Sequence, residues 1–373
     1  MIRSKLLLAA LACLLASALA SVGVAQQIQA PMFGGVGARA IGMGGAFVAV
    51  ADGTTGPQWN PAGEANGRFA VPLGAVGVAQ NFEANNIQDL LNDLDDARDG
   101  SVAAAQSLLL DALDWQNIQV AAAPYLSLGP VRGFTLYGNV QASGMAKLAA
   151  VDAGGNRVLD VGDSVTALAG VAALGNVGLA CSRPAGEGWR VGLAVKQITM
   201  KARQFNYQAA LAAGPVLNVT PLAGDTPEVD DSAFTADLGF LYRPEDSSKL
   251  SFGLVVRDIT RPDLTDQGIT MVVPRQIDVG IATEGADGIK FAADVHDLTG
   301  ARNGSATLHF GAEKQLRPWL TGRVGMFQLP RAQFNDSLRL VGGLGVQLGG
   351  FRLDVAAGTS VKKLLSGEIS WTF

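Results

Sequence analysis

The stretch LRLVGGLGVQLGGFRLDVAAG, residues 338–358, decides the fold of this chain. Leucine, valine or glycine occupies every second position from Leu338 to Leu348, and arginine or glutamine stands among the residues between them. The same period of two resumes at Phe351, after a Gly-Gly pair. A period of two indicates a strand with one apolar face, and two glycines between such runs are typical of a hairpin turn. This stretch therefore predicts an antiparallel β-hairpin.

The same alternation recurs along the chain and predicts fourteen strands. Their expected bounds are 68–80, 117–128, 132–147, 164–183, 189–203, 234–243, 250–259, 275–283, 289–298, 305–315, 319–328, 338–348, 351–360 and 366–373. The connections after even-numbered strands are short, whereas those after odd-numbered strands are mostly longer, which is typical of outer-membrane barrels. A soluble β-sandwich also has alternating strands but does not need this asymmetry. We therefore expect an all-β fold, a transmembrane antiparallel β-barrel of about 14 strands.

The chain begins with the pattern of a secretory signal peptide. A positive start is followed by an apolar run to Ala20 and by small residues up to Ala25. Export and a barrel together predict a location in the cell outer membrane, in contact with its lipid. The expected organisation is a signal peptide over 1–25, an N-terminal hatch or plug over 26–67, and a transmembrane barrel over 68–373 with a helical extracellular loop at 81–116.

Composition excludes several classes of function. The net charge of −5 and the pI of about 5.1 argue against nucleic acid as a partner. Cys181 is the only cysteine after the leader, so no intramolecular disulfide is expected. The two histidines, His296 and His309, stand 13 positions apart and form no metal motif. We expect no cofactor, no bound metal and no enzymatic activity.

The segment before the first strand is rich in glycine. It reads GARAIGMGGAFVAVADGTTGPQWNPAG over 37–63. Glycine inside a regular element costs about 0.5–1 kcal/mol relative to alanine, so this segment is unsuited to a stable helix. A barrel of fourteen strands has room for it, because about eight strands already fill with side chains. We expect it to pack inside the lumen as the hatch.

These residues also carry a resemblance. GARAIGMGGAFVAVAD and WNPAG resemble the amino-terminal hatch of the FadL-like outer-membrane β-barrels. DLGFLYRPEDSSKLSFGLVVRDITRP, VPRQIDVGIAT and IKFAADV resemble hairpins of its conjugal-transfer TraF-type and PorV-type branch, to which the chain is most similar. The resemblance assigns the hatch to Gly42, Gly44, Gly45, Asp52, Asn60, Pro61 and Ala62. A plain turn into the first strand is the alternative for the last three.

The resemblance implies two functions. One is the passage of small hydrophobic compounds by a hatch-gated route, which predicts an apolar pocket between the hatch and the loop at 81–116. The other is a non-conducting scaffold or shuttle of a conjugation or secretion apparatus, which predicts a filled lumen and a stable partner protein.

Four further features bear on the barrel. Residues 86–113 show two helical apolar stripes, which fit a cover over the barrel mouth, a capture site for an apolar ligand, or a docking site for a partner. The acidic residues between Asp225 and Asp231 fit a solvated loop or a calcium site. The aromatic terminus at Phe373 resembles the signal recognised by barrel-assembly machinery. Charges on the strands are expected to point inward, because lipid-facing Arg or Lys costs about 2–4 kcal/mol; they are Asp237, Arg257, Asp278, Asp294, His296, His309, Glu313, Arg339, Arg352 and Asp354.

Overall fold

The structure is a computed structural model, and nineteen strands are assigned in the part of the chain that it describes. The described residues are 36–65, 67–72, 77–80, 118–122, 125–151, 164–211, 217–221, 228–244, 249–266, 269–301, 305–328, 338–359 and 363–373. The strands are β1 (Arg68–Pro72), β2 (Gly77–Gln80), β3 (Ile118–Ala122), β4 (Tyr125–Val131), β5 (Phe134–Val151), β6 (Ser164–Gly186), β7 (Trp189–Leu211), β8 (Leu217–Pro221), β9 (Glu228–Tyr242), β10 (Ser251–Arg257), β11 (Asp263–Asp266), β12 (Ile269–Val272), β13 (Gln276–Glu284), β14 (Ile289–His296), β15 (Thr307–Arg317), β16 (Leu320–Gln328), β17 (Leu338–Leu348), β18 (Phe351–Thr359) and β19 (Lys363–Thr372).

Seventeen of these strands form one antiparallel sheet that closes on itself. β1 and β2, β3 and β4, and β8 and β9 are successive pieces of three interrupted strands, so the sheet has fourteen strands in all. The last strand pairs with the first, with Trp371 of β19 opposite Phe69 of β1. The predicted all-β antiparallel barrel of fourteen strands is confirmed. Closure matters because it pairs the backbone groups at the edges of the sheet.

The predicted bounds differ from the observed ones mainly on one side of the barrel. β5 and β7 extend to Val151 and Leu211, beyond their predicted ends, and β9 begins earlier, at Glu228. The predicted loop 260–274 contains the hairpin β11–β12, a separate two-stranded sheet. Small and polar residues blur the alternation in these stretches, so the strand pairing across the sheet decides their length.

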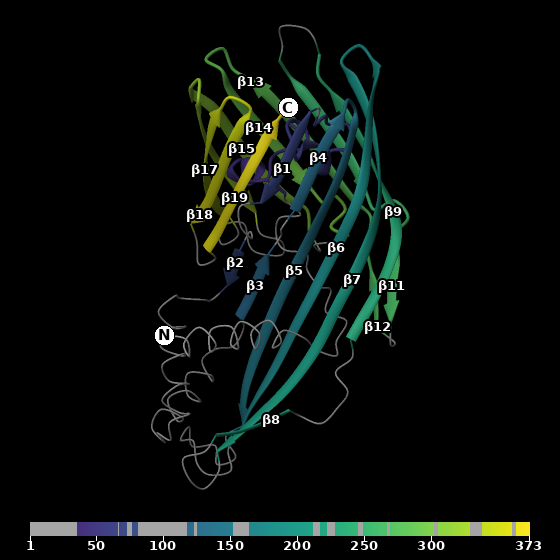
Figure 1. The fold of residues 1–373 in the computed structure, drawn as a ribbon, viewed down its shortest axis with the longest axis vertical. Coiled ribbons are helices and arrows are strands. Elements are labelled where there is room, and N and C mark those ends of the chain that lie inside the picture. Colours follow the sequence, from purple (N-terminus) through teal and green to yellow (C-terminus); the bar gives the residue numbers. More distant parts are fainter. Residues whose placement is uncertain are drawn as a thin grey trace.

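The barrel wall is uneven in height. β6 and β7 have 23 residues each, whereas β13 to β18 have 8 to 11. At about 3.3 Å per residue, 23 residues span roughly 75 Å along the strand. An apolar membrane band of about 25 Å is far shorter, even for tilted strands. Figure 1 shows β5, β6 and β7 running well beyond the ends of β17 to β19.

Side chains alternate across the wall as expected. The outward positions carry large apolar residues that are exposed, among them Leu193 of β7, Phe310 of β15 and Val324 of β16. Buried polar side chains such as Asp278 and His309 face the interior. None of the helices in the described residues is long and apolar enough to cross a membrane.

Candidate functional site

Residues 36–65, here called the inner segment, lie against the inward faces of the wall strands and are the candidate site. Every one of them is buried or half-buried. The segment has two short helices, α2 (Ala38–Gly42) and α3 (Gly56–Trp59), the second with a proline at its start. Helix α2 contacts β16 to β19. In Figure 1 the segment is the purple trace enclosed by the strands.

The wall contacts the inner segment through glycines. At eight inward positions an added Cβ would meet backbone atoms of the inner segment at 3.1 Å or less. Three cross-strand pairs of these glycines stand directly opposite one another in the sheet. We call these eight residues the glycine belt; they are Gly129, Gly192, Gly239, Gly253, Gly280, Gly311, Gly325 and Gly343.

Sequence reasoning missed the glycine belt. A glycine inside a strand weakens it and often marks the close approach of another backbone. An inward glycine in strand after strand was the signal that could have found the belt. Its physical effect is to let the inner segment approach the wall backbone directly, without side chains between them.

The predicted glycine run lies close against the wall. Gly44 and Gly45 have φ of 66° and 79°, a region that disfavours other residues. A Cβ on Gly44 would lie 2.6–2.7 Å from backbone atoms of Met326 and Phe310. A Cβ on Gly42 would lie 3.2 Å from Gly343 of the belt. Gly44 and Gly45 are therefore fixed by both conformation and space, whereas Gly42, in helix α2, is fixed by space alone.

The predicted Asn-Pro-Ala motif also contacts the wall. The Asn60 side-chain amide donates to the carbonyl oxygens of Val48 and Phe240, both at 3.0 Å. Its carbonyl oxygen accepts from the Ala62 backbone N–H at 3.0 Å. Asn60 thus links the two halves of the inner segment to β9. A Cβ on Gly192 of the belt would meet the carbonyl of Pro61.

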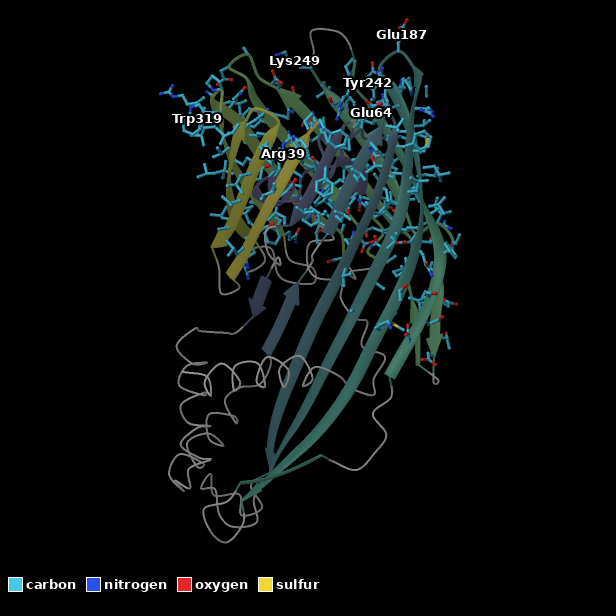
Figure 2. The ribbon with its side chains drawn as sticks, viewed as in Figure 1. Arg39, Glu64, Glu187, Tyr242, Lys249 and Trp319 are labelled. Carbon is cyan, nitrogen blue, oxygen red and sulfur yellow. The ribbon has the colours of Figure 1, made fainter. Side chains whose placement is uncertain are left out.

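A chain of charges joins the inner segment to the wall. Arg39 donates two hydrogen bonds to Glu313 at 2.7 and 2.8 Å, and it also pairs with Asp52. Glu313 accepts a further bond from Arg323 at 2.7 Å. Arg323 in turn pairs with Asp354 at 2.8 Å. Figure 2 places Arg39 within the body of the barrel.

Asp52, the predicted acidic position, is held as an anion. Its carboxylate also lies 3.4 Å from the Lys290 ammonium of β14. Burial raises the pKa of Asp52, but the attraction of Arg39 and Lys290 outweighs it, so the pKa lies below its usual range. The side chain is partly exposed, so solvent weakens the pairs.

The wall also binds the backbone of the inner segment. Asp294 accepts from the N–H groups of Phe47 and Val48, at 2.6 and 2.8 Å. Arg257 donates to the carbonyls of Gln58 and Trp59, at 3.0 and 2.6 Å. Charged partners on the wall therefore satisfy irregular buried backbone.

The charged strand residues predicted to face inward are buried or half-buried, and most of them form pairs with one another or with the inner segment. The pairs include Lys196 with Asp237 at 2.8 Å and Arg257 with Asp278 at 2.8 Å. Arg339 donates to the Leu338 carbonyl. Because charges of both signs pair with one another, this arrangement is typical of a structural network rather than of a selective ion path.

Phe373, the predicted assembly signal, lies beside the closing strand. Its backbone N–H donates to the carbonyl of Gly67 at 2.8 Å. Its ring, exposed to 60%, packs edge-on against Trp371 at 5.9 Å. Recognition by assembly machinery stays a prediction.

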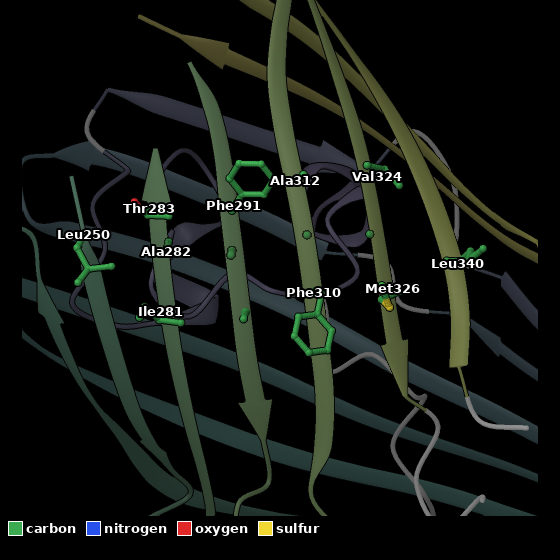
Figure 3. A pocket seen from close by; sticks show the side chains of 14 residues that line it. Leu250, Ile281, Ala282, Thr283, Phe291, Phe310, Ala312, Val324, Met326 and Leu340 are labelled. Carbon is green, nitrogen blue, oxygen red and sulfur yellow. The ribbon is translucent and has the colours of Figure 1, made fainter. Parts of the chain in front are cut away.

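An apolar depression of about 420 Å³ lies over the outward face of β13 to β17. Exposed Ile281, Phe291, Phe310 and Leu340 line it. Figure 3 shows these side chains along the neighbouring strands. Because this depression faces outward, it is distinct from the apolar pocket predicted between the hatch and the loop at 81–116. That loop lies outside the described residues.

Two other predictions fall partly or wholly outside the described residues. The signal peptide over 1–25 lies wholly outside them. The acidic segment predicted from Asp225 to Asp231 is described only from residue 228 on. The described end of the predicted loop is not a loop, because Asp230 and Asp231 belong to β9 and pair with β7. Asp230 forms an ion pair with Lys201, and the Asp231 carboxylate accepts from the Thr265 backbone N–H. Among the residues that the structure describes, no cluster of three or more His, Cys, Asp or Glu is placed to hold a metal ion.

Comparison with known proteins supports the class that this geometry defines, a fourteen-stranded barrel with an outer-membrane fold. The sequence matches no protein-family model and no curated protein. The fold is similar to that of the toluene transporter TodX of Pseudomonas putida, with a TM-score of 0.53 and 12% identity over 91% of this chain and 99% of that one.

A TodX deltaS2S3 mutant, described as a monoaromatic hydrocarbon channel, gives the same TM-score, identity and coverage. A further structure of the P. putida protein gives a TM-score of 0.50 and 11% identity over 92% of this chain and 98% of that one. At such identity the likeness shows the fold alone. The FadL-like resemblance is confirmed as a TodX-like barrel fold, and the TraF-type and PorV-type branch stays a prediction.

Proposed function

We propose that this protein is an outer-membrane barrel that passes small hydrophobic compounds, with the inner segment as its hatch. The observation that carries the proposal is the way the inner segment is held. It crosses the lumen and is attached to the wall by hydrogen bonds, ion pairs and backbone contacts. Such a closure can rearrange while the wall stays paired. The TodX-like fold supports the same proposal, since TodX is described as a toluene transporter.

The test compares the full chain with a variant in which residues 37–52 are replaced by an equal length of glycine and serine. Toluene uptake into cells and conductance in planar bilayers are the measurements. We expect the wild type to accelerate toluene uptake and to conduct little. The replacement should conduct more, because it removes Arg39 and the glycine turn while leaving the wall intact.

A milder variant, Gly45→Val, should act in the same direction. A Cβ there would lie 2.9 Å from the His309 ring, on a residue with φ of 79°. Strain of this kind costs about 1–3 kcal/mol, which should loosen the hatch without opening the wall.

A second candidate function is a non-conducting scaffold or shuttle for a secretion or conjugation partner. The dense contact between inner segment and wall favours it, because a filled lumen is what a scaffold requires. If the wild type does not accelerate toluene uptake, and the 37–52 replacement inserts as a folded barrel that stays as tight as the wild type, the transport proposal is wrong and the scaffold is preferred.

A further inference from the structure

The two histidines of the chain both bind the same turn of the inner segment. His309 of β15 has its Nδ1 2.6 Å from the Gly44 carbonyl oxygen. His296 of β14 has its Nε2 3.2 Å from the Gly45 carbonyl oxygen. Both rings are buried, and their centroids are 4.3 Å apart. Two residues far from the turn in sequence therefore hold it from adjacent strands.

The bonding partners fix the proton of His309. The Gly44 carbonyl only accepts, so the Nδ1 atom carries the hydrogen. The Nε2 atom lies 3.0 Å from the Thr307 hydroxyl, which can donate to it. A neutral His309 ring thus satisfies both of its nitrogens and holds Gly44. The Phe327 ring stacks on it at 6.1 Å and limits its rotation.

His296, by contrast, lies among carboxylates. Its ring nitrogens are 3.4 Å from Asp294 and 3.7 Å from Asp278. Asp278 also pairs with Arg257 at 2.8 Å. Two carboxylates therefore face one guanidinium and one imidazole, so a protonated His296 makes the local charges balance. Trp59 of the inner segment packs edge-on against this ring at 5.9 Å.

A proton on His309 would upset this balance. Among the ion pairs of the described residues, none joins His309 to a carboxylate. Its protonation would add a second imidazolium beside that of His296, in a place from which water is excluded. An unpaired buried charge of this kind is strongly unfavourable, and the charge is relieved if the turn moves and water enters.

We propose that the two histidines form a pH-sensitive latch on the inner segment. With His309 neutral, the latch holds Gly44 and Gly45 against the wall; with His309 protonated, the turn is released. The proposal rests on the proposed function, because release has a consequence for transport only where the inner segment closes the lumen.

The test measures bilayer conductance at about pH 8 and about pH 5, on either side of the ordinary imidazole range. The wild type should conduct at least about fivefold more at the acidic pH than at the higher pH. A factor of about five is the lower end of the usual coupling between two sites in one protein. His309→Gln should lose this pH dependence, because its amide can donate to Gly44 without titrating. Heat-modifiability at both pH values checks that each barrel stays folded.

A second readout does not depend on conduction. Because the chain has two histidines, ¹⁵N-histidine labelling gives two ring systems that NMR can resolve. The His309 Nδ1–H should exchange slowly with solvent at the higher pH and rapidly at the lower pH, where the released turn admits water. An Nδ1–H that still exchanges slowly at the acidic pH overturns the latch.

The outcomes separate the two proposals. If the 37–52 replacement conducts at both pH values and the wild type shows no pH dependence, the latch is wrong and the hatch stands. If the replacement conducts no more than the wild type, the hatch is wrong, and the NMR signal alone decides for or against the latch.

Discussion

Glycine acts in two ways at the residue scale of this molecule. In the inner segment it supplies positive φ, as at Gly44 and Gly45. In the wall it supplies empty space, as at Gly311 and Gly325, which stand opposite each other in β15 and β16. A side chain at either kind of position would force the inner segment and the wall apart.

The first prediction separates backbone strain from collision. Gly44→Ala and Gly349→Ala both place a Cβ on a residue with φ near 65°, which costs about 1–2 kcal/mol. Only at Gly44 would the Cβ also collide with the wall, since the one on Gly349 would meet nothing within 4 Å. We expect raised bilayer conductance for Gly44→Ala and wild-type conductance for Gly349→Ala. Equal effects of the two variants would contradict a close contact at Gly44.

The second prediction concerns the glycine belt. In Gly325→Val the new side chain would collide with the backbone of Met43 and Gly44. In the control Gly342→Val, on the next strand, it would point outward, where only the Arg323 carbonyl lies within 4 Å. Trypsin should cleave after Arg39 faster in the first variant and at the wild-type rate in the second. Both barrels should stay heat-modifiable, and an uncleaved Gly325→Val protein would refute the contact.

At the scale of elements, the end of the barrel with the short turns carries an aromatic rim. Trp189 of β7 packs on Tyr242 of β9 at 4.7 Å, and Phe351 of β18 stacks on Trp371 of β19 at 5.5 Å. Figure 2 shows Tyr242 and Trp319 toward this end. Exposed aromatic residues of this kind are typical of a membrane interface.

The third prediction tests the last strand. Deleting Phe373 removes its N–H bond to Gly67 and an exposed terminal ring, so we expect less folded protein in the outer membrane with export unchanged. Phe351→Ala is the matched control, because that ring is similarly exposed and also contacts Trp371. The measurement is the yield of heat-modifiable protein in membranes. A yield equal to that of the control would leave Phe373 without a role in assembly.

The hairpin β11–β12 is an element that alternation did not predict. Leu264 and Val273 pack with Ile198 and Met200 of β7 in a buried apolar cluster. Asp258, at the start of the connection, pairs with Lys196 at 2.9 Å. Four residues per strand are too few for a periodic signal, so the contact with β7 determines this hairpin.

At the scale of the whole molecule, closure of the sheet governs stability. The fourth prediction is that unboiled protein migrates differently from boiled protein in detergent gels. A closed barrel leaves no strand edge for detergent to open, and pairing of β1 with β19 completes it. Identical migration, with recovery from the soluble periplasm, would rule out the barrel in the membrane. The 37–52 replacement serves as an internal control, since its wall pairing is unchanged.

The sequence by itself determined the fold class and most of the wall. The alternation in 338–358 and the Gly349-Gly350 turn are local signals, because side-chain period and turn chemistry depend on neighbouring residues. The strand count followed from repeating that argument. The inward placement of Asp278 and Asp354 followed from the cost of charge in lipid.

Only the tertiary structure decided how the inner segment is held. The resemblance pointed to Gly44, Gly45 and Asn60, but their partners lie some 180 to 280 positions away, on Phe240, Phe310 and Met326. Many charged and glycine residues could have served such contacts equally well. Which of them meet depends on strand register and on the path of the segment through the lumen. Long-range packing fixes both, and no local pattern in the sequence reports them.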